Sequence, residues 1–470
     1  MTPSLSLRTE LAAAVSIVDL AQRLGRVCVE NERELIPLMA DPRVSMFCRK
    51  LAATVATFES EAFAEPEPGL GYLPLLDLHA IEDLVETIES THGSPLVHLA
   101  FLRGLCDRPL RQHFDGTEEL LSLGNGMPIP FAAKRPIPDV FPAHTPSSGS
   151  FNHGKLLEGV PFTLFKAPPG AAIDVEIDYG KRERLDEVTW RGGTSPLPRV
   201  ATVHPQIGSE GIATDKPDRK AGTFFGVRPR SFDLAAVLLQ LRTAARDADI
   251  AVLPELSLPP DEVEQLATEL AAAPRRYPPL VVAGSAHVLR QTASGEVRAN
   301  ESRIYLDGTH VATHSKIHPY ATRALGTRQD GGPLKEAITP GAKTLTLLGS
   351  TRTRLAVVIC SDLVDRDIVT LLMAAGVNLL LVPSLTFEQG SFNGAICVIA
   401  SFCQGVAVVV NADLDPLVED WRKRPFRVMA AVPQPEERQQ SRSFPHWFGP
   451  RRPLGIFDPN RGLRRGMRWL

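Results

Sequence analysis

The chain has 470 residues, of which 43% are hydrophobic, and a formal net charge of −3. This length and composition allow large buried cores and predict more than one domain, while the near-neutral charge does not indicate any one class of partner. Six cysteines without close pairing or metal-ligand spacing exclude a disulfide framework and predict free thiols in a reducing compartment.

Residues 1–123 are predicted to be a mainly helical region. Apolar residues recur at helical spacing from Leu7 to Leu24 and again from Leu51 to Phe58. Charged residues interrupt the first stretch, so it is typical of an amphipathic helix and not of a signal peptide. No run in the sequence is long enough to span a membrane. We therefore expect a cytoplasmic protein, and we find no catalytic motif in this region.

Residues 124–198 are predicted to be a proline-rich linker followed by a small irregular module. Prolines at high density cannot continue a helix or a central strand. They occur here at Pro128, Pro130, Pro136, Pro138, Pro142 and Pro146. Short strands are expected near residues 162–165 and 172–177.

Residues 199–432 are predicted to form one mixed α/β domain. Strand patterns at Arg199–Ile207, Ile250–Leu253 and Leu280–Ala286 alternate with helical patterns at Phe232–Arg246 and Pro260–Ala272. The Asp307-Gly308 pair then joins two strand patterns as a hairpin turn.

The centre of this domain is the stretch Leu355–Thr386. The apolar, β-branched run Leu355–Ile359 predicts a buried strand that ends at Cys360. A helix at Arg366–Ala375 and a second strand at Val377–Val382 follow. Open α/β sheets place their chemistry at such strand ends, although a lone cysteine there is more often a small buried hydrophobe.

Two charged residues upstream occupy similar positions. Glu255 follows the strand that breaks at Pro254, and Lys316 stands where a strand pattern ends before Pro319. A thiol nucleophile needs a base, and acyl transfer needs a cationic or hydrogen-bonding group for the developing oxyanion. A Glu-Lys-Cys triad is therefore predicted.

These segments together resemble the nitrilase superfamily of carbon–nitrogen hydrolases over roughly residues 199–413. The matching pieces are Pro254-Glu255, VVAGSAHV at Val281–Val288, NESRIYLDG at Asn300–Gly308, KIHP at Lys316–Pro319, ITPG at Ile338–Gly341, and the Cys360 stretch. The resemblance implies a four-layer α-β-β-α sandwich, here preceded by the helical N-terminal region.

The resemblance also implies further site residues. Glu336, in LKEAITPG, best matches the second glutamate of the family, although the adjacent Lys335 leaves open a solvated loop pair. His318 matches a residue that shapes the pocket. Ser361 replaces an aromatic residue of many relatives, and we take it, with His318 and Asp362, as substrate-binding. A metal site at His314 and His318 is not expected, because no third ligand lies nearby in the sequence.

After Asn411 the sequence departs from the family and becomes charged and proline-rich. The closing strands of the sandwich are therefore divergent, with Phe426–Val432 as one option, or lost. Residues 433–470 form a basic tail with interleaved aromatic residues. Such a tail can stack nucleic acid bases, but we favour packing on a partner subunit, because interfaces are enriched in arginine and aromatic residues.

The sequence thus predicts a thiol-dependent hydrolase of a non-peptide carbon–nitrogen bond in a small amide, with a nitrile or a carbamoyl compound as the other options. Cys360 would form the acyl-enzyme, Glu255 would act as the base, Lys316 would stabilise the oxyanion, and Glu336 would position substrate or leaving amine. No metal or organic cofactor is expected. The alternatives are an acyltransferase of the same architecture and a catalytically silent scaffold that binds a protein or nucleic acid.

A homodimer or higher homo-oligomer is also expected. The helix pattern Gly394–Gln404 carries apolar residues on more than one face. A helix of that kind is buried on more than one face, and a two-fold dimer is the commonest way to cover such a surface.

Overall fold

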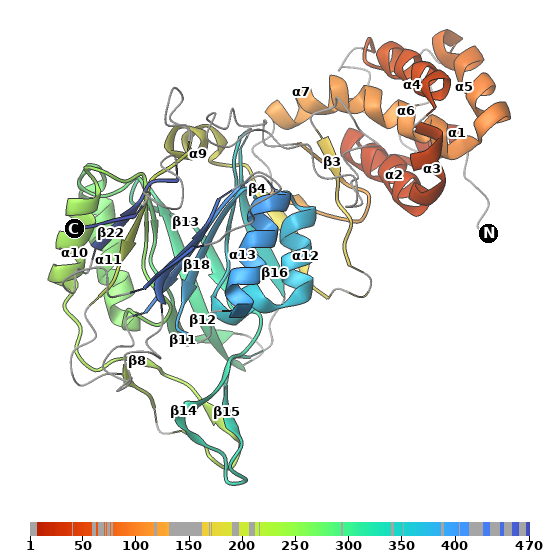
Figure 1. Ribbon diagram of the computed structural model, residues 1–470. Helices are drawn as coiled ribbons and strands as arrows, with labels where there is room; N and C mark the ends of the chain where they lie inside the picture. The colour runs from red at the N-terminus through yellow and green to blue at the C-terminus, as the bar shows by residue number, and fades with distance from the viewer. Residues whose placement is uncertain are drawn as a thin grey trace. The chain divides into compact units, whose positions relative to one another are not determined.

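The computed structural model (Figure 1) consists of two compact units. The N-terminal unit comprises described residues up to Gly170, together with the short segment Ala374–Gly376, and the C-terminal unit comprises the described residues from 172 onward outside that segment. The structure describes residues 7–39, 41–58, 63, 70, 72, 76, 79–116, 120–130, 162–168, 170, 172–189, 197–205, 212–215, 217–292, 295–339, 343–350, 352–386, 390–403, 405–412, 426–432, 442–445, 454–459 and 467–470.

The N-terminal unit is built mainly from helices around a buried central one. Its helices are α1 (Leu7–Ala13), α2 (Ile17–Glu30), α3 (Glu32–Met39), α4 (Pro42–Val55), α5 (His79–His92), α6 (Ser94–Asp107) and α7 (Pro109–Gly116). Helix α6 is apolar around its circumference and packs against α2, α4 and α5. Side-chain caps start two of the helices: Ser16 accepts from the Asp19 N–H, and Asp41 accepts from the Arg43 N–H. Three short strands follow, β1 (Leu120–Ser122), β2 (Pro128–Pro130) and β3 (Phe162–Leu164), of which β2 and β3 pair.

The C-terminal unit contains two large sheets. Strands of the first run in the order β4-β16-β17-β18-β19-β20-β21, and strands of the second in the order β11-β12-β10-β9-β5-β22-β23, with β13 paired to β12. The first comprises β4 (Asp174–Asp178), β16 (Thr344–Gly349), β17 (Arg354–Val357), β18 (Leu379–Ser384), β19 (Val406–Asn411), β20 (Phe426–Ala431) and β21 (Arg442–Pro445). The second comprises β5 (Val200–Val203), β9 (Ile250–Val252), β10 (Leu280–Val282), β11 (Ala286–Thr292), β12 (Gly295–Leu306), β13 (Thr309–Ser315), β22 (Leu454–Phe457) and β23 (Met467–Trp469).

The two sheets share one apolar core. Alternate residues of each strand point to opposite faces, so Val200 and Val252 pack with Leu355 and Leu381 of the other sheet. The intervening residue Ala201 faces the opposite way, toward the helices α10 (Leu234–Ala244) and α11 (Pro260–Ala272).

Helices also cover the outer side of the first sheet. Helix α13 (Gly390–Phe402) contacts β19 and β20, and α12 (Arg366–Ala374) lies beside it (Figure 1). A further helix, α9 (Arg182–Thr189), packs on β16. The mixed α/β fold predicted from the alternation of strands and helices is confirmed.

A separate small sheet carries one of the predicted site residues. It pairs β14 (Ala321–Thr327), β15 (Pro333–Glu336) and β7 (Thr223–Phe224), with Glu336 opposite Phe224 in the register. A two-stranded pair, β6 (Ile212–Ala213) and β8 (Arg228–Pro229), and two short 3₁₀ helices, η2 (Pro274–Arg276) and η3 (Cys360–Val364), complete the described elements.

The C-terminal unit extends beyond residues 199–432, and this corrects two of the predicted boundaries. Strand β4, in the predicted linker and module, pairs in parallel with β16. Strand β22, in the predicted basic tail, pairs with both β5 and β23. Strand β20 shows that the segment at Phe426 does form a closing strand. Trp447, Phe448 and most of the tail arginines lie outside the described residues.

Among the helices that the structure describes, none combines the length and apolar character needed to cross a membrane.

Candidate active site

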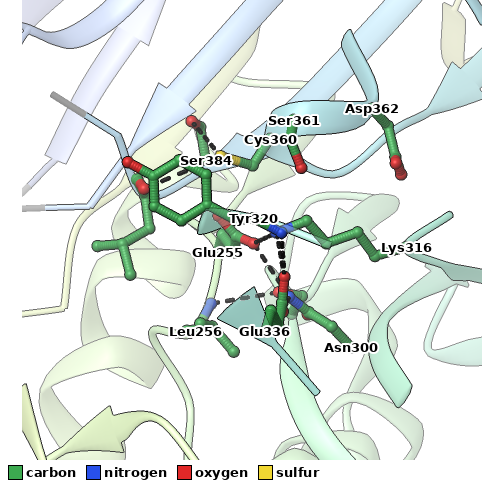
Figure 2. A network of polar contacts seen from close by, with 12 residues as sticks. Glu255, Leu256, Asn300, Lys316, Tyr320, Glu336, Cys360, Ser361, Asp362 and Ser384 are labelled. Atoms are coloured by element: carbon green, nitrogen blue, oxygen red, sulfur yellow. Dashed lines mark hydrogen bonds and ion pairs between the residues drawn. The ribbon is translucent and has the colours of Figure 1, made fainter. Parts of the chain in front are cut away.

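The four predicted catalytic residues meet at the ends of strands in the C-terminal unit. Glu255 follows β9, Lys316 follows β13, Glu336 ends β15, and Cys360 opens η3 just after β17. Figure 2 shows their side chains pointing toward one another. All four are buried, with exposed fractions of 2%, 6%, 3% and 1% respectively. The structure therefore brings together residues that are up to 105 positions apart in the chain.

Lys316 is held between the two glutamates. Its Nζ lies 2.7 Å from Oε1 of Glu255 and 2.8 Å from Oε2 of Glu336. The amide Nδ2 of Asn300 donates to the same two carboxylates, at 3.0 Å to Glu255 Oε1 and 2.8 Å to Glu336 Oε1. Two buried carboxylates are thus compensated by one cation and one amide, so burial alone does not decide their protonation.

The two carboxylates differ in proton affinity. Burial raises the pKa of Glu255, and the charge of Glu336 raises it further, against the opposing effect of Lys316. Burial would also raise the pKa of Glu336, but Lys316 and a hydrogen bond from His287 outweigh it, so that pKa falls below its usual range. Lys316 itself stays protonated, because the opposing carboxylates raise its pKa more than burial lowers it. Glu255 is therefore the better proton acceptor of the two.

Cys360 lies on a sharp turn between strand and helix. Its φ of 47° is in the left-handed region, as is the φ of 52° at Leu256, directly after Glu255. Non-glycine residues adopt this region at a cost and cluster at functional sites. The turn places the thiol near Glu255, whose charge acts on the pKa of the thiol.

The thiol has two hydrogen-bond partners, which are Ser384 at the end of β18 and Leu385 directly after it. Its Sγ donates to the carbonyl of Leu385 at 3.8 Å and accepts from the Ser384 hydroxyl at 3.5 Å. Burial raises the pKa of Cys360, and the Glu255 charge adds to that effect while Lys316 opposes it. The resting group is therefore a thiol, which must lose its proton as it attacks.

The turn that carries the thiol is bonded to the loop that follows Lys316. Asp362 accepts from the backbone N–H of Ile317 at 3.1 Å and of His318 at 2.7 Å, and its other oxygen lies 3.2 Å from Nε2 of His314. The Ser361 hydroxyl donates to the His318 carbonyl at 2.7 Å. These hydrogen bonds connect the turn that carries Cys360 to the loop that follows Lys316.

The predicted substrate-binding residues therefore have partners inside the protein. The carboxylate of Asp362 and the hydroxyl of Ser361 both bind the backbone of the loop that follows Lys316. The imidazole of His318 is 31% exposed, and its Nε2 lies 3.4 Å from Oδ2 of Asp365.

Four residues of the network were missed in the sequence. Asn300 and His287 lie inside the motif segments, and each is a polar residue on a strand. A polar residue at such a position interrupts the apolar pattern of the strand, and this interruption could have indicated a functional residue. Ser384 gave no such signal. Tyr320 donates its backbone N–H to Glu336 Oε2 at 3.0 Å, and its ring lies 5.8 Å from Lys316 Nζ.

A comparison with protein-family models gives no match, and a comparison with curated proteins gives none either. Solved structures do show similarity. One is an amidase from Nesterenkonia sp., at 17% identity over 46% of this chain and 75% of that chain, with a TM-score of 0.30. Another is a branch 10 member of the nitrilase superfamily from Saccharomyces cerevisiae, at 15% identity over 52% of this chain and 85% of that chain, with a TM-score of 0.33.

A glutamine-dependent NAD⁺ synthetase from Acinetobacter baumannii is also similar, at 15% identity over 58% of this chain and 47% of that chain, with a TM-score of 0.35. Identities and TM-scores this low leave the function to be derived from the geometry of the site. The Saccharomyces cerevisiae protein belongs to the superfamily that the sequence motifs of this chain resemble.

Proposed function

We propose that the protein is a thiol-dependent hydrolase of the carbon–nitrogen bond of a small amide or nitrile, acting through an acyl-enzyme on Cys360. The observation that supports this most is the buried arrangement of a thiol, a carboxylate of raised pKa and a cationic ammonium group. Nucleophile, base and oxyanion stabiliser are the three groups that acyl transfer needs. The order of helical and sheet layers in the C-terminal unit is compatible with the α-β-β-α sandwich implied by the sequence motifs.

Proton transfer in the proposed reaction passes through Glu255. Its carboxylate accepts the thiol proton as Sγ attacks the carbonyl carbon, which forms the C–S bond and places negative charge on oxygen. Lys316 Nζ stabilises that charge, because it remains protonated in the buried site. Collapse breaks the C–N bond, and the proton on Glu255 goes to the departing amine.

Hydrolysis of the acyl-enzyme then uses the same groups, with water in place of the amine. Water attacks the thioester and gives its proton to Glu255, and the sulfur leaves and recovers that proton as the carboxylic acid departs. Glu336 stays ionised throughout, because its pKa is well below the working range. Its proposed role is to hold Lys316 and, through it, the reacting carbonyl.

The surroundings of the thiol favour an apolar acyl group. A small apolar cluster, separate from the main cores, consists of Phe224, Val227, Leu256 and Leu334, with Leu385 half-buried against it. Leu256 follows Glu255, Phe224 is opposite Glu336, and the Leu385 carbonyl accepts from the Cys360 thiol. An acyl chain attached to Sγ would therefore meet apolar side chains, and we propose aliphatic or aryl amides over charged ones.

Intact-mass spectrometry tests the proposal. Wild-type protein is incubated with a pool of short aliphatic and aryl amides, the corresponding nitriles and charged amides. An acyl adduct is expected with an apolar member and should map to Cys360. Cys360→Ala should abolish the adduct, while the half-buried Cys397→Ala, the matched control, should keep it.

Glu255→Gln should slow adduct formation by about 10²–10⁴-fold, the usual contribution of a general base. If no adduct forms with any member while the protein still unfolds cooperatively, the silent scaffold is the better account. If adduct decay requires an added amine and not water, the protein is an acyltransferase.

A further inference from the structure

We propose that His287, as a neutral imidazole, is a positioning residue that fixes Glu336 and thereby holds Lys316 in place for the chemistry. This inference rests on the proposed function. It assigns a role to a buried histidine that no part of the mechanism above uses.

The hydrogen bonds of the imidazole determine its protonation. The backbone N–H of Val227 donates to Nδ1 of His287 at 3.0 Å, so Nδ1 is an acceptor and carries no proton. The proton must then be on Nε2, which lies 2.8 Å from Oε1 of Glu336 and donates to it. In an imidazolium, Nδ1 would also carry a proton. The Nδ1–H and the Val227 N–H would then be two donors facing each other without an acceptor between them. The side chain is 1% exposed, so bulk solvent does not reach it.

His287 completes a full set of donors around Glu336. Oxygen Oε1 accepts from His287 and Asn300, and Oε2 accepts from Lys316 and the backbone N–H of Tyr320. Four donors leave this carboxylate neither free to rotate nor free to take a proton. Glu255 has no hydrogen bond from His287 and remains available to accept the thiol proton. His287 therefore contributes to the difference in pKa between the two glutamates.

The imidazole is itself held by residues 224–227, which lie in the segment that precedes α10. Phe225 stacks on His287 with ring centroids 4.5 Å apart and an interplanar angle of 17°. Phe224 lies opposite Glu336 in the small sheet, and Val227 supplies the N–H to Nδ1. Phe225 and Val227 thus fix the ring, and Phe224 of the same segment pairs with the strand of the carboxylate, as expected of a residue that positions another.

Two substitutions separate this role from others. His287→Gln keeps one donor and one acceptor and cannot be charged, whereas His287→Leu keeps the approximate volume and removes both. His310→Leu is the matched control, because His310 is an exposed histidine of the same unit whose Nε2 bonds one hydroxyl, that of Thr313. Each protein is assayed with the amide that forms the wild-type adduct, and its melting temperature is recorded.

His287→Leu should lower kcat by about ten- to hundredfold, equivalent to about 1.4–2.7 kcal/mol, with KM changed by less than about threefold. His287→Gln should retain kcat within about threefold of wild type, as should His310→Leu. Equal losses in the Leu and Gln variants, or a Leu variant as fast as wild type, would overturn the proposal. Should the Leu variant not fold, a Gln variant with a wild-type melting temperature and at least about a tenfold loss of kcat overturns it.

A second measurement does not depend on finding a substrate. Lys316 lowers the pKa of the Cys360 thiol against the larger effect of burial, so a loosened Lys316 leaves less thiolate. Iodoacetamide labelling of Cys360, followed by peptide mapping, should be slower in His287→Leu and restored in His287→Gln. A wild-type protein without any acyl adduct would defeat the proposed function, while this labelling series would still decide the role of His287.

Discussion

At the scale of single residues, one lysine forms ion pairs with two glutamates whose pKa values are shifted in opposite directions. Glu255 and Glu336 both lie within 2.8 Å of Lys316 Nζ. Burial raises the pKa of Glu255, whereas Lys316 and the additional hydrogen bond from His287 hold the pKa of Glu336 below its usual range. Pairs of carboxyl groups whose pKa values are separated by their surroundings take different catalytic roles, which in the proposed mechanism are proton transfer for Glu255 and positioning for Glu336.

The raised pKa of Glu255 predicts the acidic side of the pH profile. The base must be deprotonated to accept the thiol proton, so acylation should fall as the pH drops through the pKa of Glu255. Because that pKa is raised, the midpoint should lie above the ordinary glutamate value of about 4.3. Glu336 remains ionised across this range and should not contribute.

Single-turnover acylation of Cys360, measured across the acidic and neutral range, checks this expectation. The melting temperature is followed at each pH, so that acid unfolding is not mistaken for titration. A midpoint at or below the ordinary value would show that Glu255 is not the proton acceptor.

At the scale of elements, the closing strands of the second sheet come from the end of the chain. Gly455 lies on β22, between β5 and β23. A Cβ there would lie 2.3 Å from Cε of Met467, 2.7 Å from Oγ1 of Thr202 and 2.9 Å from the Trp469 ring. The absence of a side chain allows the three strands to pack together.

Gly455→Val should therefore destabilise the C-terminal unit, by about 1–3 kcal/mol, the usual cost of overpacking a filled site. Urea unfolding followed by circular dichroism measures the change. Gly394→Ala in α13 is the control, because nothing lies within 4 Å of a Cβ at that position, and it should be neutral or stabilising by up to about 1 kcal/mol. A Gly455→Val protein as stable as wild type would argue against the pairing of β22 with β5.

At the scale of the whole molecule, we expect self-association through α13, which stays a prediction. Ile396 and Ile399 are buried against the first sheet, whereas Val398 is 47% exposed on the other side of the helix. An apolar residue at such a position is suited to an interface with a second copy.

Val398→Glu in the full-length protein should convert a dimer into a monomer in light scattering, because it places a charge in the interface. Leu239→Glu is the matched control, since Leu239 is 64% exposed on α10, in the helical layer on the second sheet. It should leave the dimer intact. A monomeric wild-type protein, or equal effects of the two substitutions, would contradict association through α13.

The amino-acid sequence was sufficient to predict the local units and the strand-end positions of Glu255, Lys316 and Cys360. The apolar run before Cys360 and the helical spacing after it have periods that a few neighbouring residues establish. Glu255 and Lys316 could be named because each stands where such a pattern ends, and Glu336 because its segment resembles a family motif.

Tertiary structure alone decided the contacts between distant residues. Asn300 bonds carboxylates 45 and 36 positions away, and the tautomer of His287 depends on a backbone N–H 60 positions away, so no local spacing encodes either. Strand β22 is an apolar run of four residues in proline- and arginine-rich sequence, too short to identify without its partner. Its place in the sheet follows from pairing with β5, because the hydrogen bonds of a strand are made with another part of the chain.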